Sequence, residues 1–173
     1  MINLESYKKT LTTPLKQATI CLLVKDNEVL LAMKKTGFGA GKWNGPGGKS
    51  NPGESILEAA IREVREEIAV IPINPEVVAQ INFYFPLVPL EKEWNQQVFV
   101  FKTDEWEGKP SESEEMKPAW FEFNEIPYHQ MWPDDLKWLS LVLAGKKIIG
   151  EFLYDENDTL LEYKIKPVRS IKI

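Results

Sequence analysis

Hydrophobic residues along the chain fall into short runs rich in Val, Ile, Leu and Phe, separated by polar or Gly- and Pro-containing stretches. The runs at residues 18–24 and 29–33 flank a Lys-Asp-Asn-Glu sequence, which predicts a β-hairpin. Residues 77–85 and 97–103 predict a second strand pair, and residues 119–123 a short strand. Residues 148–154 and 159–165 predict a last hairpin. The pattern therefore indicates a domain built mainly from strands.

Two other stretches have a helical period. Residues 56–68 repeat hydrophobic side chains at steps of three and four, which predicts a helix with one buried face. The residues of that face are Ile56, Leu57, Ala60, Ile61, Val64 and Ile68. Residues 133–144 predict a second helix, with Pro133 in its first turn and Gly145 after its end. Strands mixed with two helices indicate an α/β fold in which a mixed sheet lies between helices.

The remaining segments have no clear period. Residues 1–17 carry mixed charge, and we interpret them as an N-terminal extension before one domain of residues 18–173. Residues 34–46 contain four glycines and predict a loop, and residues 105–117 predict a polar, acidic loop. The sequence has no internal repeat and no low-complexity linker, so we expect a single domain.

Composition narrows the possible functions. A chain of 173 residues with 43% hydrophobic content is long enough for one domain with a core. The net charge of −5 disfavours binding to nucleic acid polymer, and phosphates would need local neutralisation by a metal or by a few Lys and Arg side chains. A single cysteine, Cys21, excludes an intrachain disulfide, and we expect it to be buried. Without a signal peptide or a membrane-length apolar stretch, we expect a cytoplasmic protein that does not bind membranes.

Three glutamates on the first predicted helix are candidates for chemistry. Glu63, Glu66 and Glu67 stand at positions i, i+3 and i+4, so their carboxylates share a helix face and repel one another. A Mg²⁺ ion would relieve this repulsion, and the preceding Gly47-Gly48 pair would let backbone carbonyls approach the same point. A solvated acidic surface explains the same spacing, because most charge clusters are exposed. The spacing alone leaves both interpretations open.

The longer pattern around these glutamates resembles the signature of the Nudix hydrolases. Gly48, five residues, Glu54, seven residues, and then residues 62–67 (Arg-Glu-Val-Arg-Glu-Glu) match nearly every fixed position of that signature. One position departs from it, because Ala69 stands where the family has a glycine that ends the helix in a left-handed turn. The resemblance implies a Nudix-type α/β/α sandwich with a mixed sheet and a loop-helix-loop. It also implies hydrolysis of a phosphoanhydride with Mg²⁺, or alternatively Mn²⁺, as cofactor.

The same resemblance implies roles for individual residues. The Gly47 carbonyl with Glu63, Glu66 and Glu67 would bind the metal, and one of these glutamates would activate water. Arg62 would orient a glutamate through a charged hydrogen bond. Glu115 is either a further ligand or base, or a solvated acid of its loop. The only histidine, His129, lies in a turn segment, where we expect a surface role.

Three further segments, residues 33–45, 112–121 and 131–138, resemble the branch of animal MutT homologues that hydrolyse oxidised purine nucleoside triphosphates. This resemblance implies a monomer that converts a free 8-oxo-dGTP or 2-oxo-dATP type nucleotide to monophosphate and pyrophosphate, and so cleanses the nucleotide pool. In that branch Asn44, Asp134 and Asp135 would bind the base edge. The remaining substrate-binding positions would be Phe38, Phe83 and Trp132 around the base, and Lys34 near the site.

Physical chemistry supports a base pocket at the two aspartates. Oxidation of guanine at carbon 8 changes N7 from an acceptor into a donor, which a carboxylate can recognise. Two adjacent carboxyl groups in apolar surroundings do not both ionise, so Asp134 and Asp135 would offer one donor and one acceptor. Exchange of that proton would admit more than one oxidised purine. The alternative is structural, with Trp132 in the core and the aspartates favouring a helix N-terminus.

Several positions leave the substrate open. Pro46, Gln96 and Tyr154 stand where the branch has an aromatic residue, a methionine and a phenylalanine. Pro86 matches a proline that marks ADP-ribose enzymes, so an ADP-ribose or nucleotide-sugar pyrophosphatase is one alternative. A catalytically idle Nudix module that binds nucleotide is another, although the intact glutamates and the acidic net charge argue against it.

Overall fold

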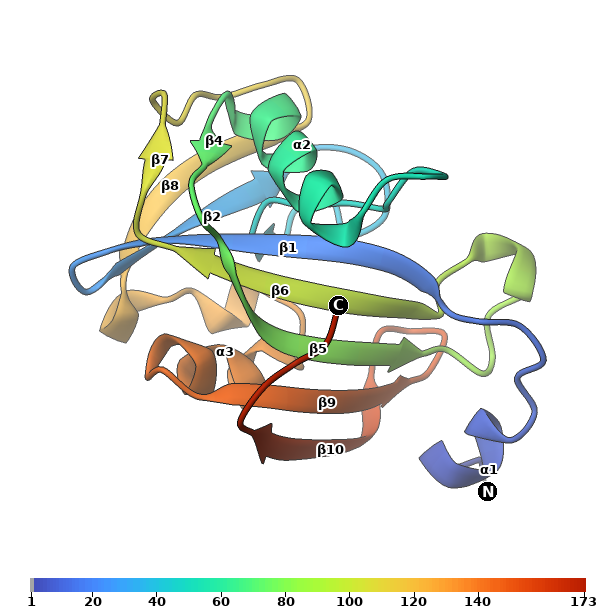
Figure 1. Cartoon of the computed structure of the whole chain (residues 1–173). Coiled ribbons are helices and arrows are strands. Elements are labelled where there is room, and N and C mark those ends of the chain that lie inside the picture. The colour runs from blue at the N-terminus through green and yellow to red at the C-terminus, as the bar shows by residue number, and fades with distance from the viewer. Residues whose placement is uncertain (1) are drawn as a thin grey trace.

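The computed structural model describes residues 2–173 (Figure 1). The helices within these residues are α1 (Leu4–Lys8), α2 (Ile56–Ile68) and α3 (Asp135–Leu143). The strands are β1 (Lys16–Lys25), β2 (Glu28–Lys34), β3 (Trp43–Asn44), β4 (Ile71–Pro72), β5 (Glu76–Tyr84), β6 (Gln96–Thr103), β7 (Trp106–Glu107), β8 (Met116–Glu122), β9 (Lys147–Tyr154) and β10 (Leu160–Val168). Short 3-10 turns lie at Leu90–Lys92, Phe123–Glu125 and Tyr128–Gln130.

One mixed sheet organises the domain. Its strand order is β10-β9-β5-β6-β1-β2-β3, and β8 pairs with β2. The β1–β6 and β5–β9 pairs are parallel, whereas β1–β2, β5–β6 and β9–β10 are antiparallel. The two predicted hairpins and the predicted β5–β6 pair are therefore confirmed, as is the mixed sheet.

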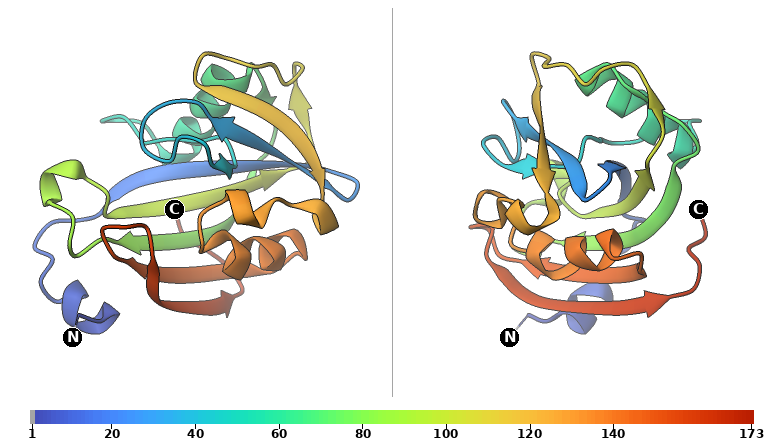
Figure 2. Two further views of the ribbon diagram at one scale, coloured as in Figure 1. Left: turned by 180° about the vertical axis from the view of Figure 1, so that it is seen from behind. Right: turned by 90° about the vertical axis from the view of Figure 1, so that its left-hand side faces the viewer.

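The two longer helices cover opposite faces of this sheet, as Figure 2 shows. Successive strand residues point to opposite faces. Accordingly, Ile20 and Leu22 of β1 pack in the hydrophobic cluster that includes α3, and Cys21 and Leu23 pack in the cluster that includes α2. The predicted α/β/α layering is confirmed, and Cys21 is buried as expected.

Helix α2 begins and ends with recognisable caps. Ser55 accepts a hydrogen bond from the Glu58 N–H, and the Glu58 side chain accepts one from the Ser55 N–H. Ala69 takes the left-handed conformation (φ 61°, ψ 31°) despite its side chain, at a cost of about 1–2 kcal/mol. The buried face differs from the prediction, because Ala59 is buried and Leu57 is 36% exposed. Leu57 therefore lies just outside the strip that packs on the sheet.

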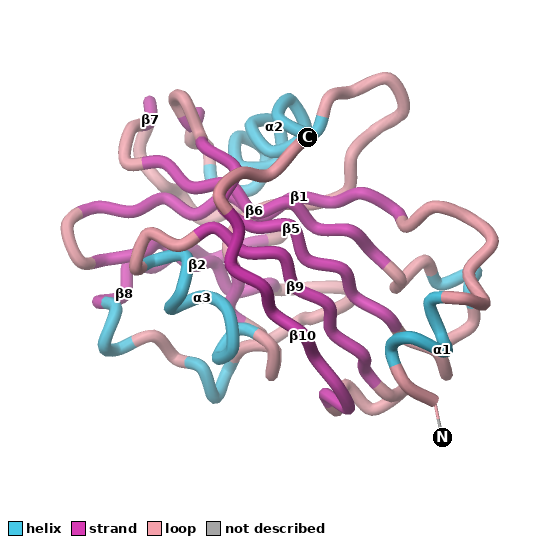
Figure 3. The backbone as a smooth tube through the Cα atoms, turned by 60° about the horizontal axis from the view of Figure 1, so that its bottom comes forward, coloured by secondary structure: helices cyan, strands magenta, loops and turns pink. Residues whose placement is uncertain are grey.

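Several short elements escaped sequence analysis. Residues 1–17, interpreted as an extension, contain α1 and the first residues of β1. Leu4 is fully buried against Tyr84 and Leu153, and Figure 3 shows α1 beside the end of β9. Strands β3, β4 and β7 have two residues each, too few for an alternating pattern. The second helix begins at Asp135, two residues after the predicted start.

Candidate active site

Residues 46–49 run beside β1, and Lys49 forms an isolated bridge with Ala18. The Thr19 and Cys21 N–H groups donate to the Gly48 and Pro46 carbonyls, each at 2.8 Å. Because carbonyls alternate along an extended chain, the Gly47 carbonyl points away from β1. The Gly47 N–H donates to Glu67 Oε2 at 3.0 Å, so Gly47 faces α2.

Two glycines are needed for this close approach. A Cβ atom on Gly47 would lie 1.9 Å from the Thr19 carbonyl oxygen, and one on Gly48 would lie 2.5 Å from the Glu63 carboxyl carbon. Any side chain at either position would separate the segment from β1 or from α2. The Gly-Gly pair thus brings the loop backbone against the Glu63 and Glu67 side chains, and no group within residues 2–173 donates a hydrogen bond to the Gly47 carbonyl.

Glu63 and Glu67 form the buried part of the acidic helix face. Glu67 is 6% exposed, and burial raises its pKa to about 8, with the Glu63 charge adding to the effect and the Gly47 N–H opposing it. Burial also raises the pKa of Glu63, against the influence of Arg62. The two carboxyl groups therefore lie in a site that disfavours negative charge unless a cation is present.

Arg62 binds the carboxylates around the loop and the helix. It donates to both oxygens of Glu54, at 2.6 and 3.0 Å, to Glu63 at 2.8 Å and to Glu66 at 3.1 Å. Arg62 therefore makes the charged hydrogen bond to Glu63 that the family resemblance implied. Glu66 turns outward with its side chain 59% exposed, so the three glutamates do not converge on one point.

The residues nevertheless fit a divalent cation. Among residues 2–173, no three Asp, Glu, His or Cys side chains are gathered closely enough to form a ligand cluster as they stand. However, Glu63, Glu67 and Glu115 line one cavity together with Gly47, and the charges of Glu63 and Glu115 both raise the pKa of Glu67. An all-oxygen donor set of this kind suits Mg²⁺, which needs only one or two protein carboxylates.

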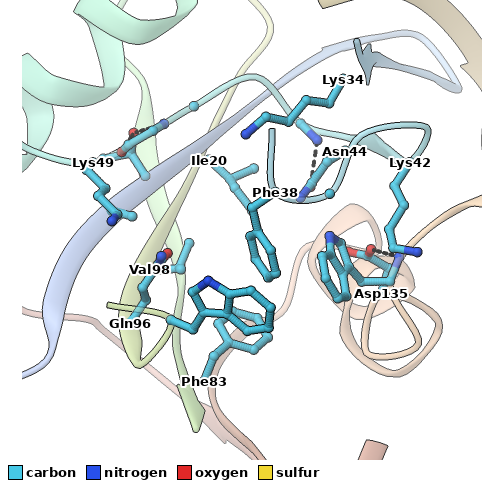
Figure 4. A pocket seen from close by; sticks show the side chains of 18 of the residues that line it. Ile20, Lys34, Phe38, Lys42, Asn44, Lys49, Phe83, Gln96, Val98 and Asp135 are labelled. Atoms are coloured by element: carbon cyan, nitrogen blue, oxygen red, sulfur yellow. Dashed lines mark hydrogen bonds between the residues drawn. The ribbon is translucent and has the colours of Figure 1, made fainter. Parts of the chain in front are cut away.

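This cavity, of about 480 Å³, extends from the glutamates to an apolar pocket. Figure 4 shows Phe38 pointing into it between Lys34 above and Phe83 below, with Lys49 on the left and Asp135 on the right. The volume is typical of small-molecule sites. The predicted site residues that line it are Lys34, Phe38, Asn44, Gly47, Glu63, Glu67, Phe83, Glu115, Trp132, Asp134 and Asp135. Arg62 and Glu66 are not among them.

Aromatic side chains form the wall of the pocket. The Phe38 ring lies 5.0 Å from the Trp132 ring and 4.3 Å from the Trp94 ring, measured between centroids. Trp94 was not predicted as a site residue, although a lone tryptophan in a polar loop was a signal that could have suggested it. Lys42 Nζ lies 4.9 Å from the centre of the Trp132 ring, close enough for a cation–π contact. The arrangement suits a flat, electron-rich ligand.

Asp134 and Asp135 lie at the polar end of this pocket and are 3% and 2% exposed. The Tyr154 hydroxyl donates to Asp134 Oδ1 at 2.5 Å, and the Trp138 indole N–H donates to Asp134 Oδ2 at 2.8 Å. Burial raises the pKa of both aspartates, and the Asp134 charge raises that of Asp135 further. Both effects favour the protonated form, so the pair disfavours two negative charges.

Other predicted positions have simpler surroundings. Asn44 accepts the Gly45 N–H at 2.8 Å through its Oδ1, which leaves its amino group as a donor to a ligand. Of the positions that depart from the family branch, Gln96 and Tyr154 line the cavity and Pro46 does not.

His129 is exposed, as expected. Burial raises the pKa of the Cys21 thiol to about 12, which makes it unreactive.

No helix within residues 2–173 combines the length and the hydrophobicity that crossing a membrane requires.

Comparison with known proteins agrees with this geometry. Residues 14–142 match the model of the NUDIX domain. The oxidized purine nucleoside triphosphate hydrolase of Danio rerio is 41% identical over 156 residues, which cover 90% of this chain and 97% of the relative. The enzyme of the same name from Mus musculus is 42% identical over 152 residues, 88% of this chain and 95% of the relative.

Solved structures extend the comparison to the fold. A MutT protein from Bacillus halodurans superposes with a TM-score of 0.76 at 32% identity, over 87% of this chain and 97% of the other. An ADP-ribose pyrophosphatase from Streptococcus suis, with a TM-score of 0.51 and 20% identity, shares the fold alone. The signature around Gly48 and the glutamates, the domain match and these relatives together show that the chain belongs to the Nudix hydrolase family.

Proposed function

We propose that this protein hydrolyses oxidised purine nucleoside triphosphates to the monophosphate and pyrophosphate, with Mg²⁺ as cofactor and Mn²⁺ as an alternative. The observation that carries the proposal is one cavity that joins the Glu63 and Glu67 carboxylates to the fully buried Asp134 and Asp135 pair. Such a cavity suits a ligand with a polyphosphate at one end and an uncharged base at the other. The names of the Danio rerio and Mus musculus relatives support the same substrate class.

In this proposal the metal side of the cavity supplies the hydrolytic chemistry. Glu63, Glu67 and the Gly47 carbonyl would bind the cation, with Glu66 and Glu115 as further candidate ligands. When bound, Mg²⁺ would orient the phosphate oxygens and offset the charge that develops on the leaving group. Arg62 keeps Glu63 in position, and a glutamate of this set accepts a proton from the attacking water.

The apolar side supplies recognition of the base. Phe38, Trp94 and Trp132 enclose a flat ring, and stacking on such side chains is worth about 1–3 kcal/mol per base. The aspartate pair offers one acceptor and one donor to the edge of the base, and the Asn44 amino group adds a donor. A pocket with fixed polar groups rejects a base that leaves them unpaired.

The substrate of this reaction is a free nucleotide. We therefore propose a role in the cytoplasmic nucleotide pool, not on nucleic acid polymer, and the net charge of −5 supports this because it repels polyanions. We also propose that the protein acts as a monomer, since residues of one chain line both parts of the cavity.

The test is pyrophosphate release in the presence of Mg²⁺ from 8-oxo-dGTP and 2-oxo-dATP, compared with dGTP, dATP and ADP-ribose. We expect a higher kcat/KM for at least one oxidised triphosphate than for its normal counterpart, and loss of turnover when EDTA removes the metal. Preferred hydrolysis of ADP-ribose, or equal hydrolysis of normal and oxidised nucleotides, would exclude the proposed substrate while leaving the Nudix chemistry in place.

A further inference from the structure

The two aspartates of the base pocket have different hydrogen-bond partners. Both side-chain oxygens of Asp134 accept hydrogen bonds, one from Tyr154 at the end of β9 and one from Trp138 on α3. Asp135 receives one hydrogen bond, from the Trp132 backbone N–H to its Oδ2 at 3.1 Å. The pair is therefore asymmetric before any ligand binds.

Both hydrogen-bond partners of the Asp134 carboxyl group act as donors to it. An indole N–H has no acceptor function, so Trp138 can only donate to Oδ2. The Tyr154 hydroxyl accepts the Asp134 backbone N–H at 3.1 Å and donates its own hydrogen to Oδ1. A proton on either oxygen of Asp134 would point at one of these donors and disrupt a buried hydrogen bond.

Asp135 lacks this restriction. Its Oδ1 receives no hydrogen bond from residues 2–173, and Asp135 lines the cavity, so this oxygen is the place for the shared proton. Two other ionisable groups act on the pair, and both are tyrosine hydroxyls. Tyr154 contacts Asp134, and the charge of Asp135 raises the pKa of Tyr128. Neither is a cation that would favour ionisation of Asp135.

We propose, building on the function proposed above, that the Tyr154 hydroxyl is a positioning group that fixes Asp134 as the ionised acceptor and leaves the proton on Asp135. The pocket then offers its donor and acceptor in one fixed order. Tyr154 thereby restricts the choice of oxidised purine through Asp134, and it also lines the cavity itself.

The restriction follows from the chemistry of the two candidate bases. An oxoguanine edge presents an acceptor at O6 followed by donors at N1 and N2, whereas a 2-oxoadenine edge presents donors at N6 and N1 followed by an acceptor at O2. The two orders are opposite, so in one orientation a fixed aspartate pair matches only one of them. Leaving buried polar groups unpaired lowers kcat/KM by about a hundredfold or more.

The test compares two tyrosine variants with the unmodified protein. Tyr154→Phe removes the hydroxyl and keeps the ring, which stacks on Phe85 at 5.2 Å. Tyr84→Phe is the matched control, because Tyr84 is also buried and its hydroxyl also contacts a carboxylate, Glu151, but it does not line the cavity. For each protein, kcat/KM is measured with 8-oxo-dGTP and with 2-oxo-dATP, and the ratio of the two values is the readout.

We expect the unmodified protein and Tyr84→Phe to prefer one oxidised nucleotide by about a hundredfold, and Tyr154→Phe to bring that ratio at least about tenfold closer to one. An unchanged ratio in folded Tyr154→Phe would overturn the proposal. Equal use of both oxidised nucleotides by the unmodified protein would overturn it as well, while the proposed function would stand. If the unmodified protein prefers no oxidised nucleotide, the proposed function fails and this inference fails with it.

A measurement on the unmodified protein makes the proposal independent of how the variant folds. Carbon-13 NMR of the aspartate carboxyl groups reports their ionisation directly. At neutral pH we expect an ionised Asp134 and a protonated Asp135. A protonated Asp134, or a proton that exchanges equally between the two, would overturn the proposal.

Discussion

Two groups of acidic residues line the same cavity and avoid mutual repulsion in different ways. On α2, Glu63 is bound by Arg62, Glu66 is exposed, and Glu67 faces Gly47. At the start of α3, Asp134 and Asp135 are bound by uncharged donors, and burial raises the pKa of both. The glutamates carry more negative charge than Arg62 neutralises, so they suit a cation with phosphates. The aspartates already have hydrogen-bond donors, so they suit an uncharged base.

The two groups also differ in how the chain assembles them. Apart from Glu115, the metal side comes from one stretch, residues 47–67, in which a loop and a helix bring their groups together locally. The base side requires residues from five distant segments, including Phe38, Phe83, Trp94 and Trp132. Its geometry therefore depends on the packing of the whole sheet, and substitutions there should change selectivity before they change chemistry.

The largest effect is expected on the metal side. Glu67→Gln keeps the size of the side chain but removes its charge and its basicity, so kcat should fall about a thousandfold. Binding of the nucleoside monophosphate, measured by calorimetry, should change little because the base pocket is intact. Glu125→Gln, at an exposed glutamate outside the cavity, is the control and should behave like the unmodified protein. A Glu67→Gln variant with normal kcat would contradict the assignment of the glutamates.

A smaller but more selective effect is expected from Asp134→Ala. The substitution removes the acceptor for the base and leaves the Trp138 and Tyr154 donors unpaired, so kcat/KM for the oxidised substrate should fall about a hundredfold. The value of kcat at saturating substrate should fall much less, because the metal side is unchanged. Steady-state kinetics gives both parameters, and an unchanged kcat/KM would exclude the aspartates from base recognition.

The difference between the locally assembled metal side and the base side, which is built from distant segments, also explains what the sequence could predict. The strand pairs, α2 and the signature around Gly48 were predictable because each depends on periodicity or spacing within one stretch. Trp94 was missed because its role depends on a loop that returns to Phe38, and nothing in the local sequence specifies that return. Helix α1 was missed because its five residues are too short for a period, and Leu4 is buried only by contacts with residues far along the chain. The hydrogen bond from Tyr154 to Asp134 joins β9 to the start of α3, so the local sequence could not predict it either.

Trp94 allows the contribution of that loop to be measured. Trp94→Ala should raise KM for the oxidised nucleotide about tenfold with little change in kcat, since one stacking wall is lost and the metal side is retained. Leu90→Ala is a matched control in the same loop, because Leu90 is 65% exposed and does not line the cavity. Steady-state kinetics of both variants would test the assignment, and equal KM values would show that Trp94 does not contact the base.

The smallest effect concerns stability and its dependence on pH. Burial and the Asp134 charge raise the pKa of Asp135 in the folded state above the ordinary value of 3.8. The folded protein therefore retains a proton that the unfolded chain releases, and folding becomes less favourable as pH rises from the unfolded pKa to the folded one. Each unit of difference in pKa corresponds to about 1.4 kcal/mol, and the stabilisation is complete only below the unfolded pKa.

Asp135→Asn should remove this dependence, because asparagine has no proton to release and its amide oxygen can still accept the Trp132 N–H. Urea denaturation at a series of pH values should show the variant gaining stability over the unmodified protein as pH rises from about 4 to neutrality. Glu67 titrates in the same direction, with a pKa of about 8, but it is present in both proteins and cancels in the difference. Asp104→Asn, at an exposed aspartate outside the cavity, is the control substitution. If Asp135→Asn gains no stability over the unmodified protein across this pH range, Asp135 is ionised in the folded protein and the contrast between the two acidic groups disappears.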